Sequence, residues 1–373
     1  MKNTINILLL FVLLAACTSV PAGKGISYSD FPKTVKLEGQ VIPLDTAVFR
    51  YPFRIRIEGG RAVVLDLHGA DHFFQMFTYP DGNYLASYGK RGDSPADMLS
   101  AENFRWNGDK LWMLDANKSE LTGAVFSESG DSLLREEAVT LDKEILRALD
   151  FVQYDDSTFI IPDYSGDNRF CFVNRKGKLL RKFGNIPTAK EEALERSRPA
   201  LAQAWRSFID YNPKNGVLAT ATQLGEVLEI YNLKDSTQVV RIGPHNEPEF
   251  KVSQGYGIPV GIMGFSDIQV TDQAIYTVFH GRTFKGLSQQ PRGKEIDGGQ
   301  YIYVFSLKGE PLMRYALDRY IYGISVDEER GIITATDVNS DEPIVEFKMN
   351  SLYICKLFGD WGGCIGDPYV HHA

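Results

Sequence analysis

The sequence lacks most of the features that would identify an activity. Its 373 residues include only 4 cysteines, no stripe of basic residues, and no apolar run long enough for a permanent membrane-spanning helix. A Gly-x-Ser-x-Gly nucleophile elbow, a Walker phosphate loop and the Asp-box of sialidases are also absent. The formal net charge of −8 argues against a nucleic-acid partner, whose phosphates require lysine and arginine. The sequence therefore predicts no catalytic residue and no cofactor.

The N-terminus carries a clear targeting signal. Lys2 precedes an apolar run from Ile5 to Leu14, which leads into Leu14-Ala15-Ala16-Cys17. Small residues immediately before a cysteine resemble the lipobox of bacterial lipoproteins. The resemblance implies that residues 1–17 form the signal peptide and lipobox, and that Cys17 is diacylated on its sulfur after cleavage. The alternative is an ordinary secretory signal that happens to hold a cysteine.

The residues after Cys17 bear on where the protein is anchored. Residues 18–34 contain proline, glycine and serine without apolar periodicity, which predicts a flexible tether. No aspartate follows Cys17, and an aspartate there resembles the inner-membrane retention cue of many Gram-negative lipoproteins. No acidic cluster follows either. We therefore expect an outer-membrane lipoprotein in the cell envelope that faces the periplasm.

The other cysteines do not form a disulfide framework, because three remain once Cys17 is acylated. Cys171 stands in an apolar stretch and is predicted to be a small buried side chain. Cys355 and Cys364 could pair in an oxidising envelope, and the sequence leaves that open.

The rest of the chain repeats a sheet-sized unit. Phe53–Tyr88 reads as four short strands joined by turns that contain glycine, aspartate and proline. Similar units start 47 to 57 residues apart, at Phe53, Phe104, Phe151, Phe208, Phe265 and Tyr322. A polar turn after an aromatic residue or valine recurs in the same phase, at Tyr79–Gly82, Phe126–Gly130, Val173–Gly177, Tyr231–Asp235 and Phe305–Gly309.

This double periodicity predicts an all-β fold: a six-bladed β-propeller of four-stranded antiparallel blades over residues 35–350, with a C-terminal tail at 351–373. The sixth unit supplies only three strands of its own. Val35–Leu44 is the favoured fourth strand, because pairing the two chain ends removes exposed sheet edges. Leu352–Phe358 is the alternative.

Two insertions interrupt the minimal unit. Thr188–Trp205 is predicted to be helical, with Thr188 and Glu191 spaced as a capping box and Pro199 dividing it into two pieces. Phe279–Gln300 is a long polar loop inside the fifth unit, and loops of that length are usually functional.

Together these features resemble a known family, the TolB-like six-bladed propeller lipoproteins. The lipobox, the six units and the segment Tyr88–Pro95 carry the resemblance. That segment is similar to the family's Gly-x-x-Gly-x-Gly-Pro-like linker, although Asp93-Ser94 replaces the expected glycine-containing stretch. Asp341–Lys348 also resembles the family's closing strand. The resemblance covers roughly residues 35–348 and implies an architecture, but no activity and no catalytic residue.

Candidate functional residues gather on one predicted face. Four units end their second strand in aspartate, where the loops between second and third strands open. Those aspartates could form a ring that binds a cation or a basic partner, or each could cap its own turn by accepting backbone N–H groups, which is favoured. The candidate ligand-binding face comprises Asp66, His68, Arg91, Asp115, Asp163, Arg169, His280, Arg282 and Asp337.

No metal site is predicted. His68 and His72 have zinc-like spacing only for a helix, and this segment is a turn. Asp337–Asp341 offers the alternating oxygens of a calcium loop, but it lacks the glycine at the sixth position and has Lys348 at the twelfth, where glutamate is required.

The favoured function is a membrane-anchored, non-catalytic propeller that binds an envelope protein, peptide or glycan through its loops. The alternative is a hydrolase or lyase with acidic residues at the channel mouth, which predicts a pocket holding at least two carboxylates with shifted pKa values. A third possibility, a structural scaffold, predicts a large exposed apolar patch.

Overall fold

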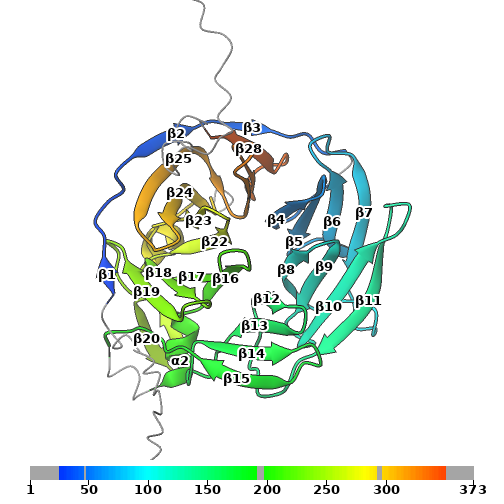
Figure 1. Cartoon of the computed structure of the whole chain (residues 1–373). Helices are drawn as coiled ribbons and strands as arrows, with labels where there is room; N and C mark the ends of the chain where they lie inside the picture. The colour runs from blue at the N-terminus through cyan, green and yellow to red at the C-terminus, as the bar shows by residue number, and fades with distance from the viewer. Residues whose placement is uncertain (1–24, 46–47, 191–196, 292–295, 350–373) are drawn as a thin grey trace, which may run out of the picture.

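The computed structural model describes residues 25–45, 48–190, 197–291 and 296–349, and its sheets form a closed ring (Figure 1). Blade 1 consists of β4 (Pro52–Glu58), β5 (Arg61–Asp66), β6 (His72–Thr78) and β7 (Tyr84–Lys90). Blade 2 consists of β8 (Ala101–Asn107), β9 (Lys110–Asp115), β10 (Glu120–Phe126) and β11 (Leu133–Thr140). Blade 3 consists of β12 (Val152–Asp155), β13 (Thr158–Pro162), β14 (Phe170–Asn174) and β15 (Leu179–Phe183). Blade 4 consists of β16 (Ser207–Asn212), β17 (Val217–Thr222), β18 (Val227–Asn232) and β19 (Thr237–Ile242). Blade 5 consists of β22 (Phe265–Val270), β23 (Ala274–Phe279), β24 (Gly299–Ser306) and β25 (Pro311–Ile321). Blade 6 consists of β26 (Ile324–Asp327), β27 (Ile332–Thr336), β28 (Ile344–Lys348) and the N-terminal strand β3 (Gly39–Val41).

The six-bladed prediction is therefore confirmed, and burial explains the strand pattern. Every residue of the middle strand β17, VLATAT, is buried, because the faces of a blade pack against its neighbours. The outermost strands alternate or are exposed, as in β11 and β15. Tight turns join the strands: Gly59 and Gly60 both adopt positive φ between β4 and β5, a conformation that glycine tolerates without cost.

The N-terminal segment closes the ring, as predicted, but with a shorter strand. β3 pairs antiparallel with β28 through only Gly39–Val41. The first part of the predicted strand instead forms β2 (Thr34–Leu37), which adds in parallel to β25 of blade 5. Gly39 permits the passage between blades, because a Cβ there would come within 2.5 Å of the Val345 side chain. The alternative closing strand, Leu352–Phe358, lies outside the described residues.

Residues 26–34, predicted as part of a tether, instead lie along the ring. β1 (Ile26–Ser27) adds in parallel to β19 of blade 4, so that one N-terminal segment follows the outer edges of blades 4, 5 and 6 (Figure 1). The Tyr28 hydroxyl donates to Glu226 at 2.8 Å, and Phe31 is buried against Tyr303 and Phe305. These aromatic contacts hold the segment against the ring. The polar and glycine-containing composition of the segment did not predict them.

The predicted helical insertion is described only in part, because residues 191–196 lie outside the described residues. Among the residues that the structure describes, α2 (Arg198–Ala204) is helical, and Pro199 stands in its first turn, where the missing N–H costs nothing. The Thr188 hydroxyl donates to Glu247 at 2.7 Å and accepts from the Lys190 amide at 3.1 Å. Glu191 lies outside the described residues. The described part of the long loop of blade 5 contains a short helix, α3 (Phe284–Ser288), and beyond blade 4 a hairpin forms from β20 (Phe250–Ser253) and β21 (Tyr256–Pro259).

Two layers of side chains fill the centre of the ring. Toward the end that carries the loops between second and third strands, the aromatic residues that begin the units converge: Phe53 of blade 1 and Phe208 of the opposite blade 4 lie 6.1 Å apart. Below them, Arg54 and Arg56 of blade 1 reach Asp267 of blade 5 at 3.2 and 2.8 Å. Buried charges are stable only when paired in this way, so the inner strands are joined across the axis.

Candidate functional site

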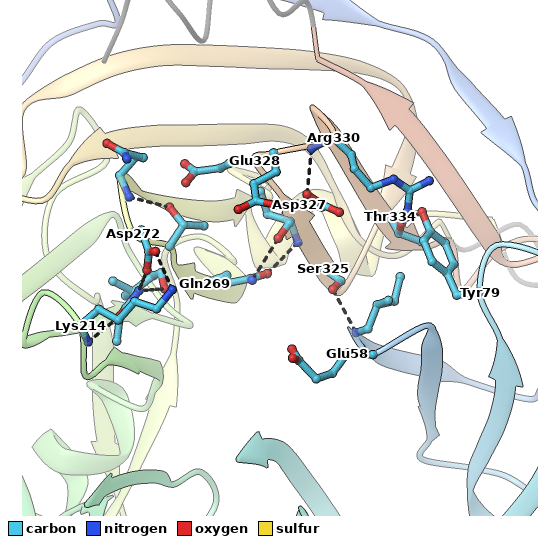
Figure 2. A pocket seen from close by; sticks show the side chains of 18 of the residues that line it. Glu58, Tyr79, Lys214, Gln269, Asp272, Ser325, Asp327, Glu328, Arg330 and Thr334 are labelled. Atoms are coloured by element: carbon cyan, nitrogen blue, oxygen red, sulfur yellow. Dashed lines mark hydrogen bonds and ion pairs between the residues drawn. The ribbon is translucent and has the colours of Figure 1, made fainter. Parts of the chain in front are cut away.

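A large hollow lies at the end of the ring formed by the turns between first and second strands. It has a volume of about 910 Å³ and is walled by blades 1, 4, 5 and 6 (Figure 2). The ends of the inner strands β4, β16, β22 and β26, with the turns that follow them, bring its polar side chains together. This volume is in the range of small-molecule and peptide sites.

Acidic side chains dominate the lining of the hollow. Its five carboxylates belong to Glu58, Asp272, Asp327, Glu328 and Glu329. Only two cationic side chains, Lys214 and Arg330, offset them. Such an excess of negative charge inside a concave, partly desolvated wall produces a strong local potential that attracts cations.

Both cationic side chains already have partners. Lys214 Nζ lies 2.8 Å from Asp272 Oδ2, and the amide of Asn212 donates to the other oxygen of that carboxylate at 2.8 Å. The Arg330 guanidinium lies over the Tyr79 ring, 5.5 Å from its centroid. The Tyr79 hydroxyl donates to Glu346 at 2.9 Å, which ties this corner of blade 1 to blade 6.

Two carboxylates of the hollow have pKa values shifted in opposite directions. Burial raises the pKa of Glu328, and the nearby charge of Asp272 raises it further, against hydrogen bonds from Thr271 and Tyr276 that lower it. The hydrogen bond from Lys214, followed by the one from Asn212, lowers the pKa of Asp272. Neighbouring carboxylates of this kind can hold a proton on one group while the other stays ionised.

The floor of the hollow is held by main-chain contacts between blades. The Gln269 side chain accepts from the Val326 amide at 2.8 Å, and Ser325 Oγ accepts from the Ile57 amide at 3.1 Å. Beneath them the buried pairs of Arg54 and Arg56 with Asp267 fill the axis. The hollow is therefore a blind depression, which the paired charges separate from the opposite end of the ring.

The predicted ligand-binding residues lie at that opposite end. Each of the nine stands in, or directly beside, a loop between second and third strands or a linker between blades. Blades 5, 6 and 1 bring five of them together around Tyr51 and Asp297: Asp66, His68, His280, Arg282 and Asp337. The Tyr51 hydroxyl donates to Asp297 at 2.5 Å, and its ring lies 5.1 Å from that of His68.

His280 is the most unusual member of this group. It is 6% exposed, its ring lies edge-on to Tyr322 at 5.5 Å, and neither ring nitrogen has a hydrogen-bond partner among the described residues. Burial lowers its pKa to about 4, with Asp297 opposing the shift and Arg282 adding to it. The side chain is therefore neutral near pH 7.

The four aspartates act as turn caps, as the favoured interpretation predicts. Within its own turn Asp66 accepts from the His68 amide, and Asp115 accepts from the amides of Asn117 and Lys118. Both carboxylates also accept from the segment before their blade, Asp66 from the Arg50 and Tyr51 amides and Asp115 from those of Leu99 and Ser100. Asp163 accepts from Ser165 and Asn168, and Asp337 from Asn339. All four are buried. Their carboxylates thus accept from the protein's own main chain, and Asp163 also pairs with Lys182 at 3.1 Å.

The two remaining arginines are also occupied. Arg91 donates to the Leu67 carbonyl oxygen, and its guanidinium lies 3.8 Å from the centroid of the Phe73 ring. Arg169 is 1% exposed and pairs with Glu229 of blade 4 at 2.8 Å. It therefore joins blades 3 and 4 and does not reach the surface. Cys171, predicted to be buried, is fully so, and burial raises its pKa to about 12.

The residues of the hollow escaped prediction from the sequence, although a signal for them exists. In three of the units that line the hollow, acidic residues follow the inner strand: Glu58 after FRIRI, Asp272 after FSDIQVT, and Asp327-Glu328-Glu329 after ISV. Blade geometry places all these strand ends on one rim. The units are recognised in the sequence by the aromatic residue that begins each inner strand. The acidic residues at the other end of these strands are not part of that pattern and were not predicted.

Other kinds of site are not evident in the described part of the chain. Within it, no three histidine, cysteine, aspartate or glutamate side chains are grouped closely enough to hold a metal ion. Nor does any helix there have the length and apolar character needed to cross a bilayer.

Comparison with known proteins agrees with the architecture. No curated protein matches the sequence. The structure is similar to that of a Bacteroides fragilis protein whose name calls it exported, with a TM-score of 0.53, 11% identity, and coverage of 87% of this chain and 99% of that one. It is also similar to a member of the duf4221 family from Bacteroides vulgatus, with a TM-score of 0.52, 10% identity, and coverage of 84% and 98%. At such identities the similarity shows the fold alone. The model of the TolB-like 6-blade propeller-like family matches residues 30–329, and the chain therefore belongs to that family.

Proposed function

We propose that this protein is an exported, lipid-anchored propeller that binds a basic ligand in its acidic hollow without chemically altering it. The ligand class is a lysine- or arginine-rich segment of an envelope protein or peptide. The observation that carries the proposal is a hollow of about 910 Å³ with five carboxylates and two cations. A rigid ring that presents such a hollow needs no moving part to bind.

Two of the carboxylates are free to meet a ligand. The exposed side chains of Glu58 and Glu329 form no ion pair or hydrogen bond within the described part of the chain, and they act on Lys214 only at a distance. Glu328 lies deeper, against Tyr276. A ligand with several ammonium or guanidinium groups could therefore pair with the rim first and the wall next, without displacing an internal partner.

The proposed location rests on the N-terminus. The lipobox-like Leu14-Ala15-Ala16-Cys17 supports a lipid anchor on Cys17, and a structural neighbour named as exported is consistent with secretion. Thr18-Ser19, without aspartate, supports the outer membrane and its periplasmic face. Envelope proteins and peptides would then be the accessible partners.

Isothermal titration calorimetry with pentalysine, and with its fully acetylated form, tests the binding. Wild type is expected to bind pentalysine and not the acetylated peptide, with affinity that falls as salt rises. Glu58→Gln with Glu329→Gln should weaken binding roughly two- to thirtyfold, since two exposed ion pairs contribute about 0.2–1 kcal/mol each. The matched control, Glu128→Gln with Glu144→Gln, removes two exposed carboxylates elsewhere and should leave binding unchanged. Equal weakening by both double variants would reduce the effect to overall charge and refute the site.

One observation favours a second candidate, a hydrolase or lyase. Glu328 and Asp272 share the hollow with pKa values shifted in opposite directions, as acid–base pairs require. Incubation with a panel of chromogenic glycosides and peptide anilides tests it. Turnover with a bell-shaped pH profile that Glu328→Gln abolishes would replace binding by catalysis. Absence of turnover across the panel, with pentalysine still bound, would leave the binding function standing.

A further inference from the structure

The hairpin of β20 and β21 stands outside the ring, beyond blade 4, and carries an exposed apolar surface. Gln254 and Gly255 at its tip both have positive φ, as a tight two-residue hairpin turn requires. Among the described residues, four exposed large apolar side chains fall within positions 252–260, and no other part of the chain has more than two in a stretch of that length. Single exposed apolar residues are normal, whereas a group of them marks an interaction surface.

One side of the hairpin is held against α2. The Gly257 backbone lies so close to the helix that a Cβ there would come within 2.5 Å of the Ala200 carbonyl oxygen, and its amide donates to the Gln203 side chain at 3.3 Å. Phe250, at the base of the hairpin, packs against the buried cluster that contains Leu201. The hairpin is therefore fixed to the ring by one side and presents the other side to solvent.

The strand pairing shows which side chains lie on the free side, because successive residues of a strand point to opposite faces and paired residues share a face. Tyr256 and Ile258 flank the glycine that packs on α2, so they point away from the helix, and Lys251 is paired with Ile258 beside them. Val260 continues the alternation, since its amide donates to the Glu249 carbonyl oxygen at 3.0 Å. The outer row, Tyr256, Ile258 and Val260, is 62%, 48% and 43% exposed.

The N-terminal end of the described structure lies near the base of this hairpin. The Gly25 backbone packs directly against the Ile242 side chain, which would overlap a Cβ at that position, and Ile242 and Phe250 pack against the same buried cluster. Gly25 follows Cys17 by eight residues, which span at most about 30 Å. A folded chain of this length has a radius of gyration of about 21 Å and is therefore roughly 50 Å across. A lipid on Cys17 thus holds the blade 4 side of the ring near the bilayer, and blade 1, on the opposite side, is out of reach (Figure 1).

We propose that the outer row of the hairpin inserts into the interface of the bilayer that holds the Cys17 lipid, as a second membrane contact of the propeller. Aliphatic side chains gain free energy on leaving water, and a tyrosine suits the headgroup level, where its ring is buried and its hydroxyl stays hydrated. The charges of Lys251 and Glu249 beside the row cancel, which fits a zwitterionic bilayer, whereas the net charge of −8 opposes a strongly anionic one.

This inference rests on the proposed lipid anchor and adds an orientation to it. The hairpin belongs to the linker between blades 4 and 5, which lies at the end of the ring opposite the acidic hollow. With the hairpin in the bilayer, the hollow stays open to solvent and to its basic ligand.

Quenching of tryptophan fluorescence by brominated phosphatidylcholine tests the contact on the full-length, acylated protein. Ile258→Trp places a fluorophore in the outer row, and Leu134→Trp, at an exposed position of β11 in blade 2, is the matched control. Both variants are reconstituted in phosphatidylcholine vesicles with and without bromine in the acyl chains, and the wild type gives the background of the native tryptophans. We expect brominated lipid to remove most of the additional emission of Ile258→Trp and to leave that of Leu134→Trp unchanged.

Flotation of the protein with the vesicles separates this proposal from the anchor on which it rests. Protein that floats while Ile258→Trp stays unquenched, or is quenched no more than Leu134→Trp, would overturn the hairpin contact and leave the anchor standing. Protein that does not float would refute the anchor and this inference with it. A dimer of the detergent-solubilised protein that Ile258→Ser dissociates would assign the outer row to a second copy of the chain and would also overturn the proposal.

Discussion

Replacement of Asp267 by asparagine should destabilise the protein more than any exposed charge substitution. Asp267 is fully buried, between Arg54 at 3.2 Å and Arg56 at 2.8 Å, and it also accepts from the amides of Ile268 and Ile324. Burial alone would raise its pKa, but the two arginines outweigh that effect and lower the pKa to about 2. The lowered pKa means that the folded state favours the charged form of Asp267.

The loss of stability should be large because asparagine leaves the two arginines without their counter-ion. Arg54 Nε and Nη1 already have no hydrogen-bond partner, and burial lowers the pKa of Arg54 to about 10 despite Asp267. Removing one partner of a buried pair costs about 3–5 kcal/mol, so we expect a loss in that range for Asp267→Asn. Adding Arg54→Leu should recover part of it, since one uncompensated charge then disappears.

Urea unfolding followed by tryptophan fluorescence and circular dichroism measures the effect. The matched control is Asp235→Asn, at an exposed turn of blade 4, where the carboxylate bonds only to Thr237 and asparagine can replace it. The control should change the free energy of unfolding by less than about 0.5 kcal/mol. A loss below about 1 kcal/mol for Asp267→Asn, or a further loss on adding Arg54→Leu, would refute the view that this ionic cluster joins the inner strands.

Three further predictions address other parts of the molecule. The pKa of His280 falls from 6.5 to about 4 on folding, so the unfolded chain binds more protons than the folded protein between those pH values. The free energy of unfolding should therefore be at its full value above pH 6.5 and should drop by up to about 3 kcal/mol as the pH falls to 4. Urea denaturation of His280→Phe should not show this drop. In urea unfolding, Gly177→Ala should lower the free energy of unfolding at least twice as much as Gly108→Ala. Alanine at either position is strained by about 1 kcal/mol because φ is positive, but only at Gly177 would the new methyl group overlap the Thr140 carbonyl. Equal losses for the two variants would contradict the packing of the turn at Gly177. Cells fed an alkyne-tagged fatty acid should label the wild type and not Cys17→Ala, and labelling of both would place the lipid elsewhere.

The number of blades was predictable because the chain repeats a physical requirement. Each inner strand must fill the centre of the ring near one end, and Phe53, Phe104, Phe208 and Phe265 pack into one buried cluster there. Each hairpin must also turn tightly, which glycine, asparagine and aspartate permit. The aromatic residue and the tight turn repeat at the same spacing along the chain. Together they predict a ring of similar blades from the sequence alone.

The candidate site was not predictable by the same route. Asp66 and Glu58 are both acidic residues at strand ends of blade 1, yet one is buried in a turn and the other is exposed at the rim of the hollow. Residue type does not distinguish them, because the difference lies in which main-chain amides face the carboxylate. Likewise, Arg169 looks like a loop arginine in sequence, and only the neighbouring blade supplies Glu229.

A crystal structure of the protein in complex with pentalysine tests the account most directly. We predict ammonium groups of the peptide in the hollow, within ion-pair distance of Glu58, Glu328 or Glu329, with the buried pair of Arg56 and Asp267 unchanged beneath them. Peptide bound instead at the opposite end of the ring, among Tyr51, His68 and Asp297, would contradict the assignment of the acidic hollow as the binding site.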